Sequence, residues 1–386
     1  MSRLAPLDKA LVLILVPLWV VCFSLGVRTQ LRGGAVAMVG LSVEDADSYP
    51  ALTGVYGRNI HPSDPLVQAG LRAGDRLVQM GNADLRGVGT LGFIGRTLDE
   101  SGREALSVPL VFERDDERRE TSLALVPVSI FGPPLTGSFA LAVSALFLLL
   151  RARPTPTVRA WFYCGMSAAF CTCLFPGSGL QFYFSWGVTA AALSVFFASS
   201  FNFLFRFPDD RAPESPWHRI WPWFFSVPHG LFFLLSFSNQ MGLGQMGFTA
   251  TVVLGFLASL VVATRKYQRA DLVGRRQMKW VLLGFYCVAL ALAVSIAASV
   301  LDPRLGWLWF ASYWAVPLVP LALVISVVRF NLFDIDRLLS ATASYNILLV
   351  LLGAAALVVV PRLSEAASGL VGIDPGTGQV ALSLLL

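Results

Sequence analysis

The sequence predicts a polytopic α-helical membrane protein that carries one small β-rich soluble domain. Of its 386 residues, 55% are hydrophobic and only 14% are charged, whereas about a quarter of the residues in soluble domains are charged. The charges are also unevenly spread, because residues 28–127 carry 14 of the 24 acidic and 11 of the 29 basic residues. A segment of about 100 residues with this composition is typical of a soluble domain.

Long apolar stretches predict the membrane spans, since a spanning helix needs about 20 mostly apolar residues. The first covers residues 10–27, and because no small-residue cleavage pattern follows it, we expect a retained anchor and not a signal peptide. A tenth begins near Val380, and we expect it to continue beyond Leu386 in a longer protein. The eight spans between them are predicted at 129–150, 160–175, 183–205, 219–237, 246–264, 279–300, 307–328 and 344–360.

The basic residues of the loops predict the orientation. One set of alternate loops, counted with the N-terminal tail, contains 16 Lys and Arg residues, and the opposite set contains only Arg304 and Arg362. Basic loops stay in the cytoplasm, so the tail (residues 1–9) is predicted to be cytoplasmic and the soluble domain extracytoplasmic. The net charge of +5 then reflects topology. We therefore expect the lipid bilayer as a partner and no nucleic acid.

The soluble domain is predicted over residues 36–127. Short β-type runs separated by turn residues indicate strands, and two helices are expected, one closed by Gly70 and one at 89–98. This pattern predicts a small β-rich barrel with two helices. The strands are expected at 55–56, 76–80, 108–112 and 121–126, and the first helix at 63–71.

The run PLVQAGLRAGDRLV at 65–78 resembles the PDZ family in its bacterial form. Gly70 and Gly74 suit a helix end and a tight turn, and Asp75 can accept hydrogen bonds from backbone amides there. The resemblance implies a groove that binds an extended peptide as an added strand. The candidate ligand-binding residues are Leu52, Thr53, Gly54, Val55 and Tyr56. They keep little of the family's Gly-hydrophobic alternation, so a spacer without a ligand, or a domain that contacts its own membrane bundle, remains the alternative.

Two polar residues are predicted to lie inside the spans. His229 follows Pro228 in the span at 219–237, and an intramembrane ionisable residue suggests a functional site. The alternative is a structural histidine whose hydrogen bonds are satisfied by its neighbours. Asn202 is expected to join helices by a hydrogen bond. The five cysteines lie in apolar stretches, so we expect no disulfide framework, no metal site and no cofactor.

Two runs in the membrane segment, RRQMKWVLLG at 275–284 and RFNLFDIDRLL at 329–339, resemble runs in bacterial membrane sensor histidine kinases of the competence-pheromone type. The apolar stretches place the second to eighth spans within residues 128–328, and the ninth span and the start of the tenth within 344–386. The resemblance implies a bacterial inner membrane and a cytoplasmic coupling segment at 329–343 between these two parts. The residues of that segment expected to transmit the signal are Phe333, Asp334, Asp336 and Arg337.

The same resemblance implies a sensory input module. It would act as a homodimer, respond to a peptide, a pheromone or a membrane-borne signal, and drive a cytoplasmic output domain, a histidine kinase, beyond this chain. The chain itself contains no catalytic constellation. A non-enzymatic scaffold or transporter and a PDZ-bearing intramembrane protease are the alternatives. The sequence has no H-E-x-x-H motif, which argues against the protease. It also has no matched pair of broken spans with polar groups at the middle of the membrane, which argues against the transporter.

Overall fold

In the residues that it describes, the computed structural model is 71% helical and contains a small amount of antiparallel sheet. It describes residues 6–33, 35–37, 40–54, 69–100, 107–127, 132–151, 155–173, 178–211, 215–236, 241–301, 305 and 308–330. The expected strand at 55–56, most of the helix at 63–71, and the spans at 344–360 and from Val380 lie outside these residues.

The β-rich domain contains a six-stranded antiparallel sheet in the order β2-β3-β4-β6-β7, with β5 paired to β4. A separate two-stranded pair, β1 with β8, brings the two ends of the domain together. The strands are β1 (Ala35–Val36), β2 (Gly40–Ser42), β3 (Ala51–Gly54), β4 (Arg76–Met80), β5 (Ala83–Asp84), β6 (Ser107–Arg114), β7 (Glu117–Ala124) and β8 (Val126–Pro127).

Alternating burial explains why this sheet forms. Along β6, Val108, Leu110 and Phe112 are buried while the residues between them are more exposed, as expected of a strand with one face on a core. Asp115 and Asp116 have φ of 54° and 62°, so they make the two-residue hairpin between β6 and β7 that needs positive φ at both positions. The predicted strand at 76–80 is confirmed as β4.

One described helix covers the core of this domain. Helix α3 (Thr90–Glu100) matches the predicted helix at 89–98, and its residues Phe93 and Ile94 are buried. Phe93 belongs to the same core cluster as Leu41 and Leu77 of the sheet. Burial of these apolar side chains is the main force that holds the helix on the sheet.

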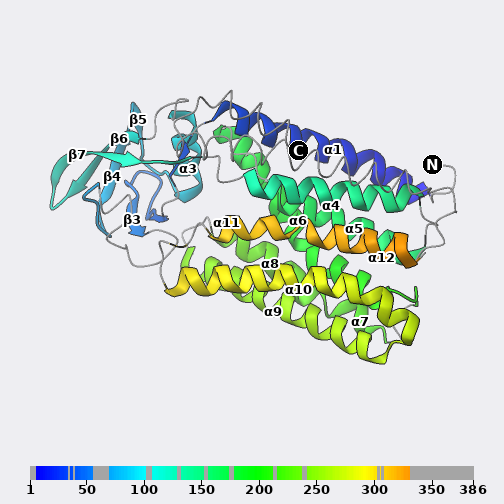
Figure 1. The fold of residues 1–386 in the computed structure, drawn as a ribbon. Helices are drawn as coiled ribbons and strands as arrows, with labels where there is room; N and C mark the ends of the chain where they lie inside the picture. The colour runs from blue at the N-terminus through cyan, green and yellow to red at the C-terminus, as the bar shows by residue number, and fades with distance from the viewer. Residues whose placement is uncertain are drawn as a thin grey trace, which may run out of the picture. The chain divides into compact units, whose positions relative to one another are not determined.

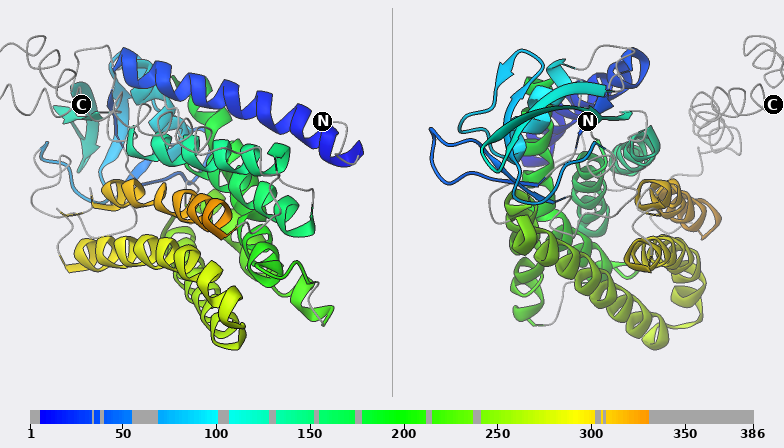
Figure 2. Two further views of the ribbon diagram at one scale, coloured as in Figure 1. Left: turned by 45° about the vertical axis from the view of Figure 1, so that its right-hand side comes forward. Right: turned by 90° about the vertical axis from the view of Figure 1, so that its left-hand side faces the viewer.

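The remaining helices form a bundle (Figure 1). Helix α6 packs against α5, α8 and α9, while α10 packs against α9 and α12. Figure 2 shows the same arrangement from two further sides. The helices are α1 (Pro6–Arg32), α4 (Gly132–Arg151), α5 (Pro156–Cys171), α6 (Gly179–Arg206), α7 (Trp217–Ile220), α8 (Trp223–Leu235), α9 (Met241–Arg269), α10 (Leu272–Leu301), α11 (Leu308–Ser312), the 3-10 helix η3 (Tyr313–Ala315) and α12 (Leu318–Phe330).

A buried hydrogen-bond chain joins the first three helices of the bundle. Trp19 of α1 donates from Nε1 to Ser138 Oγ of α4 at 2.9 Å, and Ser138 Oγ donates to the carbonyl of Ala169 in α5 at 2.8 Å. Each polar group is therefore satisfied inside an apolar environment. A hydroxyl that both accepts and donates fixes α1 and α5 on either side of α4.

Five helices in the described part of the chain are long and apolar enough to cross a membrane: Asp8–Arg32, Gly132–Leu150, Gly179–Arg206, Met246–Arg269 and Gly274–Ala298. They correspond to five of the ten predicted spans, which supports a membrane-embedded helical protein.

Three other predicted spans have a different form. The span at 160–175 is the 16-residue helix α5, the span at 219–237 is divided into α7 and α8, and the span at 307–328 is divided into α11, η3 and α12. Prolines stand at two of these divisions, Pro222 just before α8 and Pro317 just before α12. Because proline has no N–H, it begins a helix more readily than it continues one. Hydropathy alone does not detect these interruptions.

Candidate functional site

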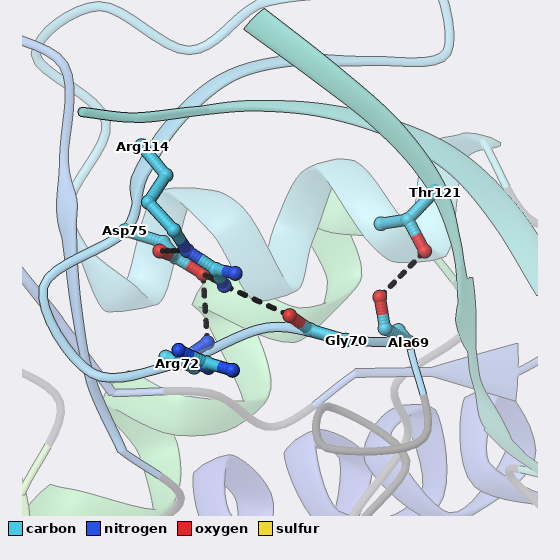
Figure 3. Close-up of polar contacts among 6 residues, drawn as sticks. All are labelled: Ala69, Gly70, Arg72, Asp75, Arg114 and Thr121. Carbon is cyan, nitrogen blue, oxygen red and sulfur yellow. Dashed lines mark hydrogen bonds and ion pairs between the residues drawn. The ribbon is translucent and has the colours of Figure 1, made fainter. Parts of the chain in front are cut away.

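The most tightly bonded polar group of the β-rich domain is Asp75, whose side chain is only 3% exposed. Arg114, at the end of β6, donates to it twice, from Nε to Oδ1 at 2.7 Å and from Nη2 to Oδ2 at 2.6 Å. The backbone N–H of Arg72 donates to Oδ2 at 2.7 Å. Arg114 also donates from Nη2 to the carbonyl of Gly70 at 2.8 Å (Figure 3). The hydrogen bond to Asp75 raises the pKa of Arg114 above its usual value.

The turn before β4 holds Asp75 in place. Gly70 and Gly74 have φ of 76° and 93°, a backbone conformation that residues other than glycine rarely adopt. Leu52 N donates to the carbonyl of Asp75 and Gly74 N donates to the carbonyl of Leu52, both at 2.8 Å. The predicted bond from Asp75 to a backbone amide is present at Arg72. The ion pair between Arg114 and Asp75 was not predicted. It depends on the pairing of β4 with β6, which lie far apart in the chain.

The candidate ligand-binding residues divide into three groups. Leu52 is 1% exposed and belongs to the core, so its side chain packs and does not face a ligand. Thr53 is exposed, and Gly54 pairs with Gly40 of β2. Val55 and Tyr56 lie outside the described residues. Within the described part, Thr53 is therefore the member whose side chain is open to solvent.

A direct contact joins the β-rich domain to the bundle. Asp99, near the end of α3, accepts a hydrogen bond at its Oδ1 from Gly179 N, the first residue of α6, at 2.9 Å. Ser178 caps the same helix by accepting from Gln181 N at 3.3 Å. Carboxylates favour helix N-termini because the N–H groups there lack partners and carry partial positive charge. The sequence allowed a domain that contacts its own bundle as an alternative, but it did not identify Asp99 and Gly179 as the residues of the contact.

Glycines allow the close approach at this contact. A Cβ added at Gly179 would lie 2.6 Å from Asp99 Oδ2 and 3.1 Å from the carbonyl of Gly95, and one added at Gly95 would lie 3.1 Å from Tyr183 Oη. The glycines in α3 and at the start of α6 were the features of the sequence that could have indicated a close approach of the two helices. Their spacing alone does not identify a partner.

His229 lies inside the bundle and is 2% exposed. Its Nδ1 is 2.8 Å from Thr251 Oγ1 of α9. Its ring stacks on Phe248 at 4.6 Å between centroids and meets the edge of Phe197 at 5.1 Å. These partners support the structural alternative, in which His229 joins α8 to α9.

Asn202 differs from its prediction. Its Oδ1 accepts a hydrogen bond from Nε of Arg206 at 2.9 Å, so the bond lies within one turn of α6 and does not join two helices. The prediction was wrong because a basic residue four positions along a helix is a nearer partner than any group on another helix.

The described residues contain no group of three or more His, Cys, Asp or Glu side chains that could hold a metal ion. The cysteines are free, and Cys22, Cys164 and Cys173 are buried. The expected signalling residues Phe333, Asp334, Asp336 and Arg337 lie outside the described part of the chain. No family model matches the sequence, and no curated protein or solved structure matches it significantly.

Proposed function

We propose that this chain is the sensory input module of a bacterial inner-membrane signalling protein, with a PDZ-like extracytoplasmic domain that passes its signal to a helical bundle. The observation that carries the proposal is the hydrogen bond between Asp99 of the β-rich domain and the first residue of α6. Because α6 is one of the helices long enough to span a membrane, the contact gives an outer domain a route into the bundle.

The tight packing at this contact supports transmission. A methyl group added at Gly179 would lie 2.6 Å from Asp99 Oδ2, and one added at Gly95 would lie 3.1 Å from Tyr183 Oη, so we expect a displacement of α3 towards α6 to push on α6. Helix α6 also packs against α5, α8 and α9. Closely packed interfaces change between discrete arrangements and do not deform gradually, which is the behaviour that a switch needs.

The resemblance of the runs at 275–284 and 329–339 to sensor histidine kinases supplies the rest of the proposal. The bundle would act as a homodimer and drive a histidine kinase through the segment at 329–343. A peptide, a pheromone or a membrane-borne molecule would be the signal.

Asp99→Ala is expected to release the first turn of α6. The N–H of Gly179 loses its acceptor, so its hydrogen exchange should accelerate about fivefold, as expected for a lost helix cap of about 1 kcal/mol. Hydrogen exchange with mass spectrometry on the whole chain in detergent measures this. Asp84→Ala, at an exposed site, is the control. Equal exchange at the start of α6 in both variants would remove the observation on which the proposal depends.

The output is tested by Asp334→Ala combined with Asp336→Ala in the full-length protein. We expect normal membrane insertion and a change in basal autophosphorylation of about fivefold or more, the smallest usual effect of a coupling between sites. Asp115→Asn with Asp116→Asn, two adjacent exposed acids in the β6–β7 turn, is the matched control. Unchanged output in the first pair, or a reading frame that stops directly after Leu386, would overturn the kinase-input proposal.

A further inference from the structure

A largely apolar groove of about 650 Å³ runs along one face of α6. Its walls come from α1, α5, α6, α7 and the start of α8, and its residues on α6 extend from Val188 to Arg206. At a rise of about 1.5 Å per residue this stretch is about 27 Å long, close to the hydrocarbon thickness of a bilayer, about 30 Å.

The groove is wide because its wall on α6 is built from small side chains. Ala191, Ala192, Ala198 and Ser199 line it there, and such residues leave room for an apolar chain between helices. Leu15 of α1 and Phe170 of α5 are among the residues on the other sides. A chain of CH₂ groups can occupy this groove by van der Waals packing, since an acyl chain in the bilayer is already out of water and gains no hydrophobic free energy there.

One end of the groove is basic. Arg206, His218 and Arg219 line it there, together with Asn202. Asn202 Oδ1 accepts from Nε of Arg206 at 2.9 Å, which orients the guanidinium. In the part of the chain that the structure describes, no acidic residue lines the groove and neither Arg206 nor Arg219 forms an ion pair.

We propose that this groove binds an anionic glycerophospholipid, with an acyl chain along α6 and the phosphate between Arg206 and Arg219. A long apolar wall with two uncompensated cations at one end matches the charge and shape of such a lipid. Arginine binds phosphate oxygens through several N–H groups at once. Since no carboxylate is present to match a choline or ethanolamine ammonium, the groove favours a headgroup with net negative charge.

The position of the basic end agrees with this occupant. The loop charges predict that the end of α6 at Arg206 faces the cytoplasm. Trp223, 45% exposed, lines the groove at that end, and tryptophan favours the level of the lipid headgroups. The site shares α6 with the proposed signalling route but includes neither α3 nor the segment at 329–343, so lipid binding can be tested separately from signalling.

Native mass spectrometry of the purified whole chain tests the site. The protein is titrated in detergent with phosphatidylglycerol and, separately, with phosphatidylcholine of the same acyl chains. We expect about tenfold tighter retention of phosphatidylglycerol, the preference that two arginines near a headgroup can provide. Arg206→Gln combined with Arg219→Gln should abolish this preference.

Two further variants separate the charge from the apolar wall. Arg265→Gln with Arg269→Gln removes two exposed arginines at the end of α9 that do not line the groove, and should leave the preference intact. Ala191→Trp fills the groove and should weaken retention of both lipids. Equal retention of the two lipids by the unaltered chain, or a preference that survives Arg206→Gln with Arg219→Gln, would overturn the proposal. Displacement of the lipid by soluble glycerol phosphate would assign the site to free phosphate and reject the lipid.

Discussion

Asp75→Ala is expected to lower the free energy of unfolding of the β-rich domain by about 3 kcal/mol. The variant removes a carboxylate that is 3% exposed and leaves Arg114 and the N–H of Arg72 without their acceptor. Removing one partner of a buried, hydrogen-bonded ion pair costs about 3–5 kcal/mol. Arg114 is 17% exposed, so water compensates part of the loss. Hydrogen exchange of the amides in β4 and β6, measured on the whole chain, reports the change.

The control for this variant is Asp84→Ala. Asp84 and Arg86 lie 3.7 Å apart with side chains 62% and 58% exposed, and such surface pairs contribute little. Exchange in β4 should therefore stay close to that of the unaltered chain. Equal effects of the two substitutions would show that the bonds of Asp75 do not stabilise the domain.

At alkaline pH, the stability that the Asp75–Arg114 pair contributes depends on whether Arg114 stays protonated. Asp75 raises the pKa of Arg114, so the contribution of this group is complete below its unfolded pKa and is lost only as the pH rises through the higher folded value. Both pKa values of an arginine lie far above neutral pH. Raising the pH from about 7 to 10 should therefore leave this contribution unchanged.

Gly230→Ala is expected to destabilise the bundle by about 1–3 kcal/mol, the usual cost of an added methyl group in a packed core. A Cβ at Gly230 would lie 2.9 Å from the carbonyl oxygen of Ala190 and 3.0 Å from Ser194 Cβ. Rotation of the Ser194 hydroxyl would not relieve these two contacts, so α8 must move away from α6. The thermal unfolding midpoint in detergent should fall measurably.

Gly187→Ala provides the matched control, because an added Cβ at this position in α6 meets nothing within 4 Å. Alanine is also the better helix former, by about 1 kcal/mol. The midpoint should stay the same or rise slightly. If Gly230→Ala and Gly187→Ala gave the same midpoint, close packing of α6 on α8 would not limit the stability of the bundle.

The elements that the sequence predicts well are those with a strong local pattern. Helices α1, α6, α9 and α10 follow from hydropathy, and β4 follows from its apolar residues and the glycine turn before it. The interruption between α7 and α8 was missed because the apolar run continues through Pro222, and a sum of hydropathies does not register the lost N–H.

The candidate sites were harder to predict because they depend on residues far apart in the chain. The partner of Asp75 lies 39 positions away and the partner of Asp99 lies 80 positions away. Each partner is an ordinary arginine or glycine with no distinctive neighbours. The prediction that Asn202 joins two helices was wrong for the opposite reason. Its hydrogen-bond partner, Arg206, lies only four positions away in the same helix.

The bond from Asp99 to Gly179 also restricts the path of the chain through a bilayer. It requires the start of α6 to lie beside the β-rich domain. In the proposed topology, α4 and α5 then form a helical hairpin that leaves the outer side of the membrane and returns to it. With 16 residues, α5 is about 24 Å long, shorter than the hydrocarbon thickness of about 30 Å. In that topology the lipid around α5 would thin or the flanking polar side chains would reach outwards, so the thickness of the membrane would act directly on this helix.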